Sequence, residues 1–289
     1  MKLGGIEGGG TKFICAVGDE FGNIEKELVV QTTTPEETLD KIIDFYKSNP
    51  VEKIGIGCFG PLDINKNSIN YGMIFDTPKK GWSNFNIVKY LNERINIPVV
   101  INTDVNVAAL AEKFVGESKG LNNILYITVG TGIGVGAIID NKIINGVNHS
   151  EMGHIALRKH PMDNFEGNCN FHKDCFEGLA SGPAIEKRYN KKGEFLSNET
   201  QVWEIVGYYI GQALAIYTFI FSPQRIILGG GVSFQKDLLP IIKENFIQFN
   251  NYYIKNDYIS DIDNYIQLTS LHNRAGLIGS ILISIYNEN

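Results

Sequence analysis

The chain opens with the stretch Leu3-Gly4-Gly5-Ile6-Glu7-Gly8-Gly9-Gly10-Thr11-Lys12, and Ile124-Leu125-Tyr126-Ile127-Thr128-Val129-Gly130-Thr131-Gly132 repeats its pattern near the middle. In each stretch an apolar run predicts a strand, and the loop rich in glycine and threonine predicts a turn into a second strand. A polar turn and a third strand follow in both blocks. We interpret the repeat as an internal duplication, which predicts two similar α/β halves.

Helices and further strands surround these two blocks. A capping box at Thr34-Pro35-Glu36-Glu37 predicts a helix start. Strands are expected over 51–58, 98–101 and 225–228, and helices after Asp104 and over 199–221, 237–249 and 275–285. This alternation indicates an α/β fold. We expect an N-terminal α/β domain over 1–116, with a closing helix from 274–289 packed on it, and a C-terminal α/β domain over 117–273.

Composition excludes several classes of protein. Of 289 residues, 43% are hydrophobic, which is enough for a sizeable core, and the net charge is −6. An acidic chain lacks the basic excess that holds phosphate backbones or anionic lipid, so we expect no nucleic-acid or membrane partner. Glu7 interrupts any signal-like apolar run, and Glu204 and Gln212 break the apolar stretch 202–221. We therefore expect a cytoplasmic protein.

Three glycine loops follow predicted strands: Gly8-Gly9-Gly10-Thr11, Gly130-Thr131-Gly132 and Gly229-Gly230-Gly231. Glycines let backbone N–H groups approach phosphate oxygens, and a threonine hydroxyl adds a donor. Any one loop is better explained as a tight turn, but the three together favour a nucleotide held between two domains. A fourth stretch, residues 55–60, fits the dinucleotide pattern, yet Pro61 and the following polar turn replace the helix that pattern requires. We expect no dinucleotide there.

Asp104 lies between a predicted strand and a predicted helix, in Asn102-Thr103-Asp104-Val105-Asn106. A helix cap is the commonest role for aspartate at such a place, and spacing alone favours it. The alternative is a carboxylate at a strand end that accepts the proton of a hydroxyl as its oxygen attacks phosphorus.

His154, Cys169, His172 and Cys175 form a compact set of metal ligands. Two thiolates and two imidazoles suit tetrahedral Zn²⁺, and the filled shell predicts a structural ion. By contrast, Cys15 and Cys58 stand in apolar strands and are expected in the core. The other histidines (His149, His160 and His272) have no evident partner and are expected to be solvated.

Several motifs together resemble the ROK family of sugar kinases over nearly the whole chain. They are Ile6-Glu7-Gly8-Gly9-Gly10-Thr11-Lys12, Thr103-Asp104-Val105-Asn106, Gly130-Thr131-Gly132-Ile133-Gly134, Glu151-Met152-Gly153-His154, Cys175-Phe176-Glu177-Gly178, Gly229-Gly230-Gly231-Val232 and Ala275-Gly276-Leu277-Ile278-Gly279. Within the family, the opening stretch and Thr77-Pro78-Lys79-Lys80-Gly81-Trp82 resemble the bacterial fructokinase subgroup.

The resemblance implies an actin-like, RNase H-like ATPase fold, with two α/β domains around a cleft that holds ATP and sugar. It implies Asp104 as the catalytic base, Mg²⁺ and Zn²⁺ as cofactors, and a homodimer. Sugar hydroxyls would meet Glu151, His154 and Glu177, with Asn106 nearby. The phosphates would meet Gly8, Gly9, Gly10, Thr11, Gly130, Thr131 and Gly132, and the adenosine would meet Pro183, Gly229, Gly230, Gly231 and Val232.

Two positions depart from the family pattern. Glu7 stands where the first strand often ends in aspartate, and the zinc loop has His172 in a C-x2-H-x2-C arrangement in place of the more frequent C-x-C-x4-C. The expected reaction is transfer of the γ-phosphoryl group of ATP to the 6-hydroxyl of D-fructose. Glucose, mannose or an N-acetylated hexosamine is the nearest alternative substrate. A sugar-sensing regulator, which would carry a DNA-binding segment before the first strand, and a non-catalytic actin-like protein are less favoured.

Overall fold

The computed structural model describes residues 1–286, and its internal contacts divide the chain into two compact units. Unit 1 contains residues 1–120, 141–150 and the chain from 271 onward, and unit 2 contains residues 121–140 and 151–270. The division expected from the sequence places residues 117–120, 141–150 and 271–273 in the C-terminal domain, whereas they group with unit 1.

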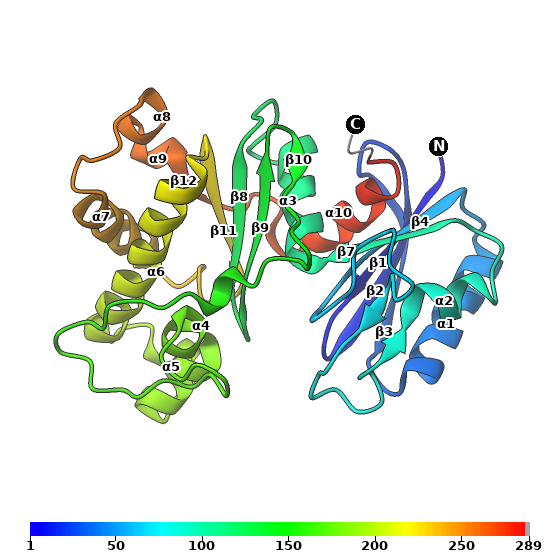
Figure 1. The fold of residues 1–289 in the computed structure, drawn as a ribbon, viewed down its shortest axis with the longest axis horizontal. Helices are drawn as coiled ribbons and strands as arrows, with labels where there is room; N and C mark the ends of the chain where they lie inside the picture. The colour runs from blue at the N-terminus through cyan, green and yellow to red at the C-terminus, as the bar shows by residue number, and fades with distance from the viewer. Residues whose placement is uncertain (287–289) are drawn as a thin grey trace. The chain divides into compact units, whose positions relative to one another are not determined.

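The sheet of unit 1 has the strand order β3-β2-β1-β4-β7 (Figure 1). These strands are β1 (Leu3–Gly8), β2 (Lys12–Gly18), β3 (Ile24–Gln31), β4 (Lys53–Cys58) and β7 (Val99–Thr103). β2 pairs antiparallel with both β1 and β3, whereas β4 is parallel to β1 and to β7. The parallel strands therefore end at one edge of the sheet, where β1, β4 and β7 deliver the loops that carry polar residues.

Helices cover both faces of this sheet because paired glycines open both faces of β1. A Cβ on Gly4 would lie 2.8 Å from the ring of Tyr46, and one on Gly5 would lie 2.5 Å from Ile281. The two glycines point to opposite faces, so one admits α1 and the other admits α10. The further elements of unit 1 are α1 (Pro35–Ser48), β5 (Met73–Ile74), β6 (Phe85–Asn86), α2 (Ile87–Asn92), α3 (Asp104–Phe114), β10 (Lys142–Ile143), η3 (His272–Arg274) and α10 (Ala275–Ile283).

The glycines at 55 and 57 serve helix packing. A Cβ on Gly55 would collide with the backbone oxygen of Ser280 in α10, and one on Gly57 would collide with Val107 in α3. No helix follows β4 until Ile87. The expectation that this stretch is not a dinucleotide loop is consistent with both observations.

Unit 2 repeats the strand arrangement of unit 1. β8 (Ile124–Val129) pairs antiparallel with β9 (Ile133–Ile139) and parallel with β11 (Arg225–Gly229), which in turn is parallel to β12 (Ile266–Leu268). β8, β9, β11 and β12 thus correspond to β1, β2, β4 and β7. The helical elements of unit 2 are η1 (Met152–His154), α4 (Phe176–Ala180), α5 (Gly182–Tyr189), η2 (Gly193–Leu196), α6 (Thr200–Phe221), α7 (Leu238–Asn250), α8 (Asp257–Ser260) and α9 (Ile262–Tyr265).

The apolar helix α6 is a core element of unit 2. It is long and apolar enough to cross a membrane by length and composition, but 61% of its most apolar window is buried inside the protein. Gly207 and Gly211 let α7 pack closely along it, since a Cβ on either would meet Ile241 or Asn245 at 2.5–2.6 Å. The prediction of a buried helix over this stretch is confirmed.

Candidate active site

Asp104 is the first residue of α3, directly after β7. The helix is capped by Thr103, whose Oγ1 accepts from the backbone N–H of Asn106 at 3.3 Å. The prediction that Asp104 is the cap is therefore wrong, because the threonine one residue earlier fills that position. The half-buried Asp104 carboxylate accepts from its neighbour, the Val105 N–H, at 2.9 Å.

Two buried asparagines fix the turn that presents Asp104. Asn102 Oδ1 accepts from the Thr103 N–H and from Asn106 Nδ2, both at 2.8 Å. Asn102 is 6% exposed and Asn106 is 2% exposed. Buried polar groups that are hydrogen-bonded to one another favour one geometry. The hydrogen bonds at the junction of β7 and α3 thus fix the backbone that positions the Asp104 carboxylate.

Glu7, near the end of β1, is the second carboxylate of this region. Burial, and then the charge of Asp104, raises the pKa of Glu7 to about 7. Its Oε2 is buried and has no hydrogen-bond partner among residues 1–286. Its other oxygen is close to α10, where a Cβ on Gly276 would approach it to 2.5 Å. Divalent cations such as Mg²⁺ prefer oxygen ligands. A buried carboxylate oxygen without a hydrogen-bond partner, influenced by the charge of a second carboxylate, fits that preference.

The glycine loop after β1 is tied to the strand that follows. Gly9 donates its N–H to the Lys12 carbonyl at 3.0 Å, and its own carbonyl accepts from Thr32 Oγ1 at 2.8 Å. The Thr32 N–H donates to the Thr11 carbonyl at 3.0 Å. The carbonyls of Gly9 and Thr11 are therefore occupied; Gly10 is half-buried and Thr11 is exposed.

Unit 2 brings three predicted nucleotide-binding segments together. The Gly182 N–H donates to the Gly130 carbonyl at 2.7 Å, so the loop after β8 meets the start of α5, where Pro183 stands. A Cβ on Gly130 would lie 3.9 Å from the backbone nitrogen of Gly231. A Cβ on Gly231 would have no neighbouring atom within 4 Å among the described residues, so the space beside it is open. Val232 donates its N–H to the Val129 carbonyl at 3.0 Å. The segments at 130–132, 182–183 and 229–232 thus border one region.

Glu177 joins this region to the loop with the metal-type ligands. It stands in the first turn of α4, and its Oε2 accepts from the Ile133 N–H at 2.9 Å, next to Gly132. Glu151 is exposed and precedes η1, the short turn that ends at His154. Gly153 lies so close to the Ile133 carbonyl that any side chain would collide with it. Glu177 and the turn that joins Glu151 to His154 thus both contact Ile133, the first residue of β9.

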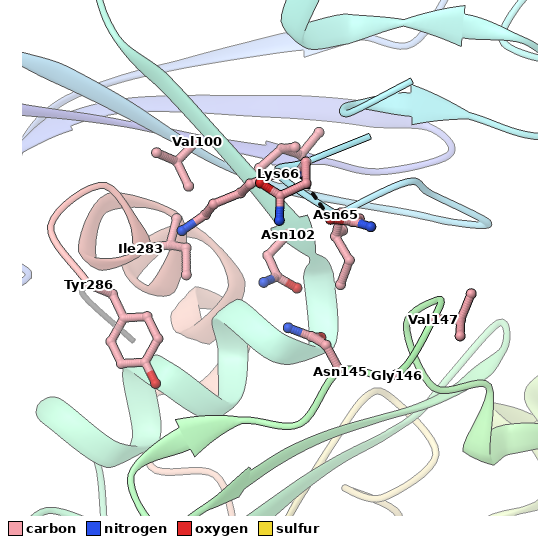
Figure 2. A pocket seen from close by; sticks show the side chains of 12 residues that line it. Asn65, Lys66, Val100, Asn102, Asn145, Gly146, Val147, Ile283 and Tyr286 are labelled. Atoms are coloured by element: carbon pink, nitrogen blue, oxygen red, sulfur yellow. Dashed lines mark hydrogen bonds between the residues drawn. The ribbon is translucent and has the colours of Figure 1, made fainter. Parts of the chain in front are cut away.

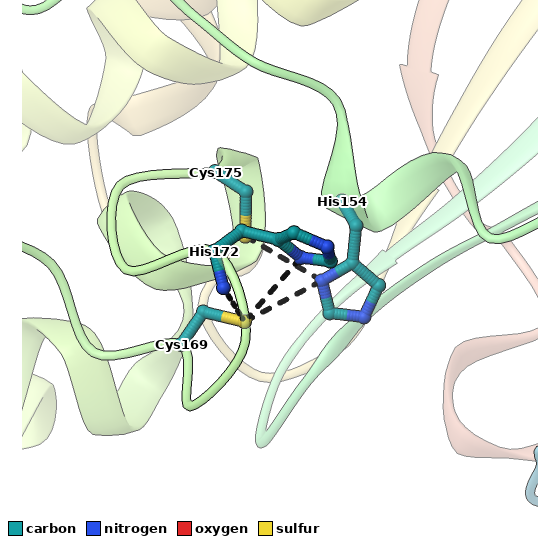
Figure 3. A group of neighbouring side chains, drawn as sticks. All are labelled: His154, Cys169, His172 and Cys175. Atoms are coloured by element: carbon teal, nitrogen blue, oxygen red, sulfur yellow. Dashed lines mark hydrogen bonds between the residues drawn. The ribbon is translucent and has the colours of Figure 1, made fainter.

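His154, Cys169, His172 and Cys175 form one cluster in unit 2 (Figure 3). One ligand atom from each lies within 4.8 Å of all the others. The Nδ1 of His154 is 3.4 Å from Cys175 Sγ and 3.7 Å from Cys169 Sγ, and His172 Nδ1 is 3.8 Å from Cys169 Sγ. A tetrahedral zinc with Zn–N of about 2.05 Å and Zn–S of about 2.3 Å places its ligands about 3.4–3.8 Å apart. These three distances match that spacing, so the cluster could hold a tetrahedral zinc.

Local structure explains why the chain forms this cluster. Cys169 and Lys173 exchange two backbone hydrogen bonds of 3.0–3.1 Å, and Lys173 has a positive φ of 52°, so the chain turns tightly between the two cysteines. Burial raises the pKa of Cys175 to about 11, which disfavours its thiolate until a cation is present. Since His154 directs Nδ1 at the sulfurs, its Nε2 is the nitrogen left to face a ligand.

A buried ion pair anchors the segment before the cluster. Arg188 Nη2 in α5 donates to Asp163 Oδ2 at 3.0 Å and to the Leu179 carbonyl at 2.8 Å. Tyr209 donates to the same Asp163 oxygen at 2.7 Å, and the guanidinium lies over the Phe165 ring at 4.5 Å. This network ties residues 163–165 to the end of α4, the helix that carries Glu177.

Unit 1 also contains a cavity of about 310 Å³. It is lined by residues 64–67, 100–102 and 145–147 together with Ile283 and Tyr286, and Figure 2 shows Asn102 and Asn145 in its wall. Asp104 is not among its lining residues. Nearby, the Leu62 N–H donates to His149 Nε2 at 3.0 Å, so the prediction of a solvated, partnerless His149 is wrong.

Two units with the same strand order, each with a glycine loop after its first strand, are typical of the actin-like ATPase fold. The chain belongs to the ROK family, whose model matches residues 3–286. The resemblance stated from the motifs is thereby confirmed.

Similarity to bacterial fructokinases extends over almost the whole chain. A putative fructokinase of Bacillus subtilis (strain 168) is 49% identical over 98% of this chain and 95% of its own length. A fructokinase of Pediococcus pentosaceus is 43% identical over 98% of both. Among solved structures, the ROK hexokinase of Thermus thermophilus has a TM-score of 0.82 and 26% identity, covering 99% of this chain and 98% of its own.

Proposed function

We propose that this protein phosphorylates D-fructose at the expense of ATP, giving fructose 6-phosphate and ADP. The full-length fructokinase relatives, at 39–49% identity, support the substrate. The observation that carries the chemistry is the placement of Asp104 and Glu7. Asp104 follows β7 and Glu7 lies near the end of β1, on either side of β4, and the charge of Asp104 adds to burial in raising the pKa of Glu7, beside the Gly8–Thr11 loop.

In the proposed step, Asp104 is the catalytic base. The 6-oxygen of fructose forms a bond to the γ-phosphorus of ATP, and the bond from that phosphorus to the β–γ bridging oxygen breaks. The hydroxyl proton passes to the Asp104 carboxylate, and the electron pair of the broken bond stays on ADP. Asn102 and Asn106 orient the carboxylate by holding the turn below it, since positioning supplies much of the catalysis in phosphoryl transfer.

Two kinds of donor would hold the phosphates. The hydroxyls of Thr11 and Thr131 are one kind, and the backbone N–H groups of the glycines are the other: Gly8, Gly9 and Gly10 in unit 1 and Gly130 and Gly132 in unit 2. Pro183, Gly229, Gly230, Gly231 and Val232 would border the adenosine, which the meeting of these segments supports. Glu7 would hold Mg²⁺, which offsets phosphate charge when bound.

Glu151, His154 and Glu177 are proposed to bind sugar hydroxyls. Zn²⁺ held by His154, Cys169, His172 and Cys175 would fix the loop and leave His154 Nε2 as a donor to the sugar. We also propose a homodimer in the cytoplasm, on the basis of the family resemblance.

A coupled ADP-release assay over a panel of hexoses tests the proposed substrate. D-fructose should give a kcat/KM at least about tenfold above those of glucose, mannose and N-acetylmannosamine, because a site that hydrogen-bonds particular hydroxyls rejects sugars that misplace them. A higher kcat/KM for any of the other three would overturn the assignment of fructose.

A further inference from the structure

The segment 77–83 carries a lysine into the phosphate region of unit 1. Lys79 is half-buried, and a Cβ on Gly10 would lie 2.5 Å from its Cε and 2.8 Å from its Nζ. The ammonium group therefore lies directly against the backbone of the glycine loop. A side chain at position 10 would displace the end of Lys79 from this place.

The lysine has no anionic partner in the protein. Within residues 1–286, no carboxylate forms an ion pair with the ammonium of Lys79, and no side chain accepts a hydrogen bond from it. Lys66 and Lys89, which likewise form no ion pair within residues 1–286, are exposed, whereas Lys79 is half-buried. A half-buried lysine without a counter-charge in the protein can pair with an external anion.

A buried tryptophan holds this lysine in place. Trp82 is fully buried and stacks on Phe13 of β2 with ring centroids 5.0 Å apart. Its indole Nε1 donates to the Thr33 carbonyl at 2.9 Å, and its backbone N–H donates to the Lys79 carbonyl at 3.1 Å. The same side chain thus fastens the turn with Lys79 to the strand end that also ties down the glycine loop.

Space for an anion lies beside the ammonium. A cavity of about 260 Å³ opens between the glycine loop and this turn. Its lining residues are Gly10, Thr32, Thr33, Thr34, Lys79, Lys80 and Trp82. No acidic side chain is among them, so the cavity suits a phosphate group.

We infer that Lys79 is a catalytic residue that binds the terminal phosphates of ATP and offsets the negative charge on the transferred phosphoryl group. This inference rests on the proposed placement of the phosphates at the Gly8–Thr11 loop. A charge-assisted contact of this kind strengthens as charge develops on the phosphoryl oxygens, so Lys79 acts on kcat as well as on ATP binding.

The test compares Lys79→Met with Lys79→Arg and with Lys89→Met, a control at an exposed position of α2. Lys79→Met should lower kcat/KM for ATP about 10- to 100-fold. It should weaken calorimetric binding of ATP more than that of AMP, and leave the dissociation constant of fructose unchanged. Lys79→Arg should restore most of the activity, and Lys89→Met should match the wild type. Lys79→Gln serves if Lys79→Met unfolds at a lower temperature than Lys89→Met.

A kcat/KM within twofold of the wild type in Lys79→Met or Lys79→Gln would overturn the inference, as would equal losses for ATP and AMP. Thr11→Val separates this failure from failure of the proposed phosphate site. If Thr11→Val weakens ATP and Lys79→Met does not, the lysine assignment alone is wrong. If neither variant weakens ATP, the loop assignment falls with it.

Discussion

At the scale of single residues, Glu7 is a carboxylate whose environment opposes its charge. Burial, and secondarily Asp104, raises the pKa of Glu7 to about 7. The unfolded chain loses this proton near pH 4.3, whereas the folded protein keeps it until about pH 7. The stability contributed by the neutral form is therefore present at acidic pH and is lost as pH rises toward 7.

Glu7→Gln should remove this pH dependence, because the amide stays neutral. We expect its free energy of unfolding to exceed that of the wild type by about 1–3 kcal/mol at pH 8 and to match it below about pH 4. Urea unfolding at several pH values, without Mg²⁺ or nucleotide, measures this. Glu25→Gln, at an exposed position of β3, is the control. Equal pH profiles for the wild type and Glu7→Gln would show that folding does not raise the pKa of Glu7.

His172 is the exposed member of the four-residue cluster, and its role can be separated from that of His154. We expect about one zinc ion per wild-type chain, and His172→Ala should lose most of it during dialysis against a chelator. Because His154 belongs to the same cluster, the zinc-free protein should have a raised KM for fructose while the KM for ATP changes little. Metal analysis and steady-state kinetics measure both, with His272→Ala as control. A zinc-free wild type with unchanged fructose KM would contradict this account.

At the scale of elements, close packing of α10 on β4 depends on the absence of a side chain at Gly55. A Cβ there would collide with the backbone oxygen of Ser280, which cannot rotate away. Gly55→Ala should lower the free energy of unfolding of unit 1 by about 1–3 kcal/mol or more. Gly146→Ala is a matched control, since its Cβ would meet only the Asn148 carbonyl at an ordinary 3.5 Å. The measurement is the midpoint temperature of thermal unfolding of the two variants, which should be lower for Gly55→Ala. Equal midpoints would refute the packing argument.

Most elements were predictable from sequence because their signals are local. The strand over 124–129 and the helix over 200–221 follow from apolar runs and their flanking turns, and Thr34 caps α1 as the capping box predicts. The cap of α3 could not be predicted from the sequence. Thr103 and Asp104 are both residue types that cap helices well, and only the backbone conformation decides between them. The hydrogen bond from Leu62 to His149 joins residues 87 positions apart, and no local pattern indicates it.

At the scale of the whole molecule, the duplication visible in the sequence appears as the same strand pairing in both units. The four metal-type ligands were predictable from spacing, since three of them occupy one short loop. The position of Lys79 against Gly10 was not, because it depends on Trp82 stacking on a strand some seventy residues earlier in the chain. The site thus combines local motifs with contacts that only the folded chain supplies.

The central claim is that Asp104 takes the proton of the sugar hydroxyl. The most direct measurement is the turnover of Asp104→Asn with D-fructose, together with its dissociation constant for ATP. The account predicts a kcat lower by about 10²- to 10⁴-fold, with ATP affinity within about threefold of the wild type, because the amide keeps the shape of the carboxylate but cannot accept the proton. A kcat near that of the wild type would contradict it.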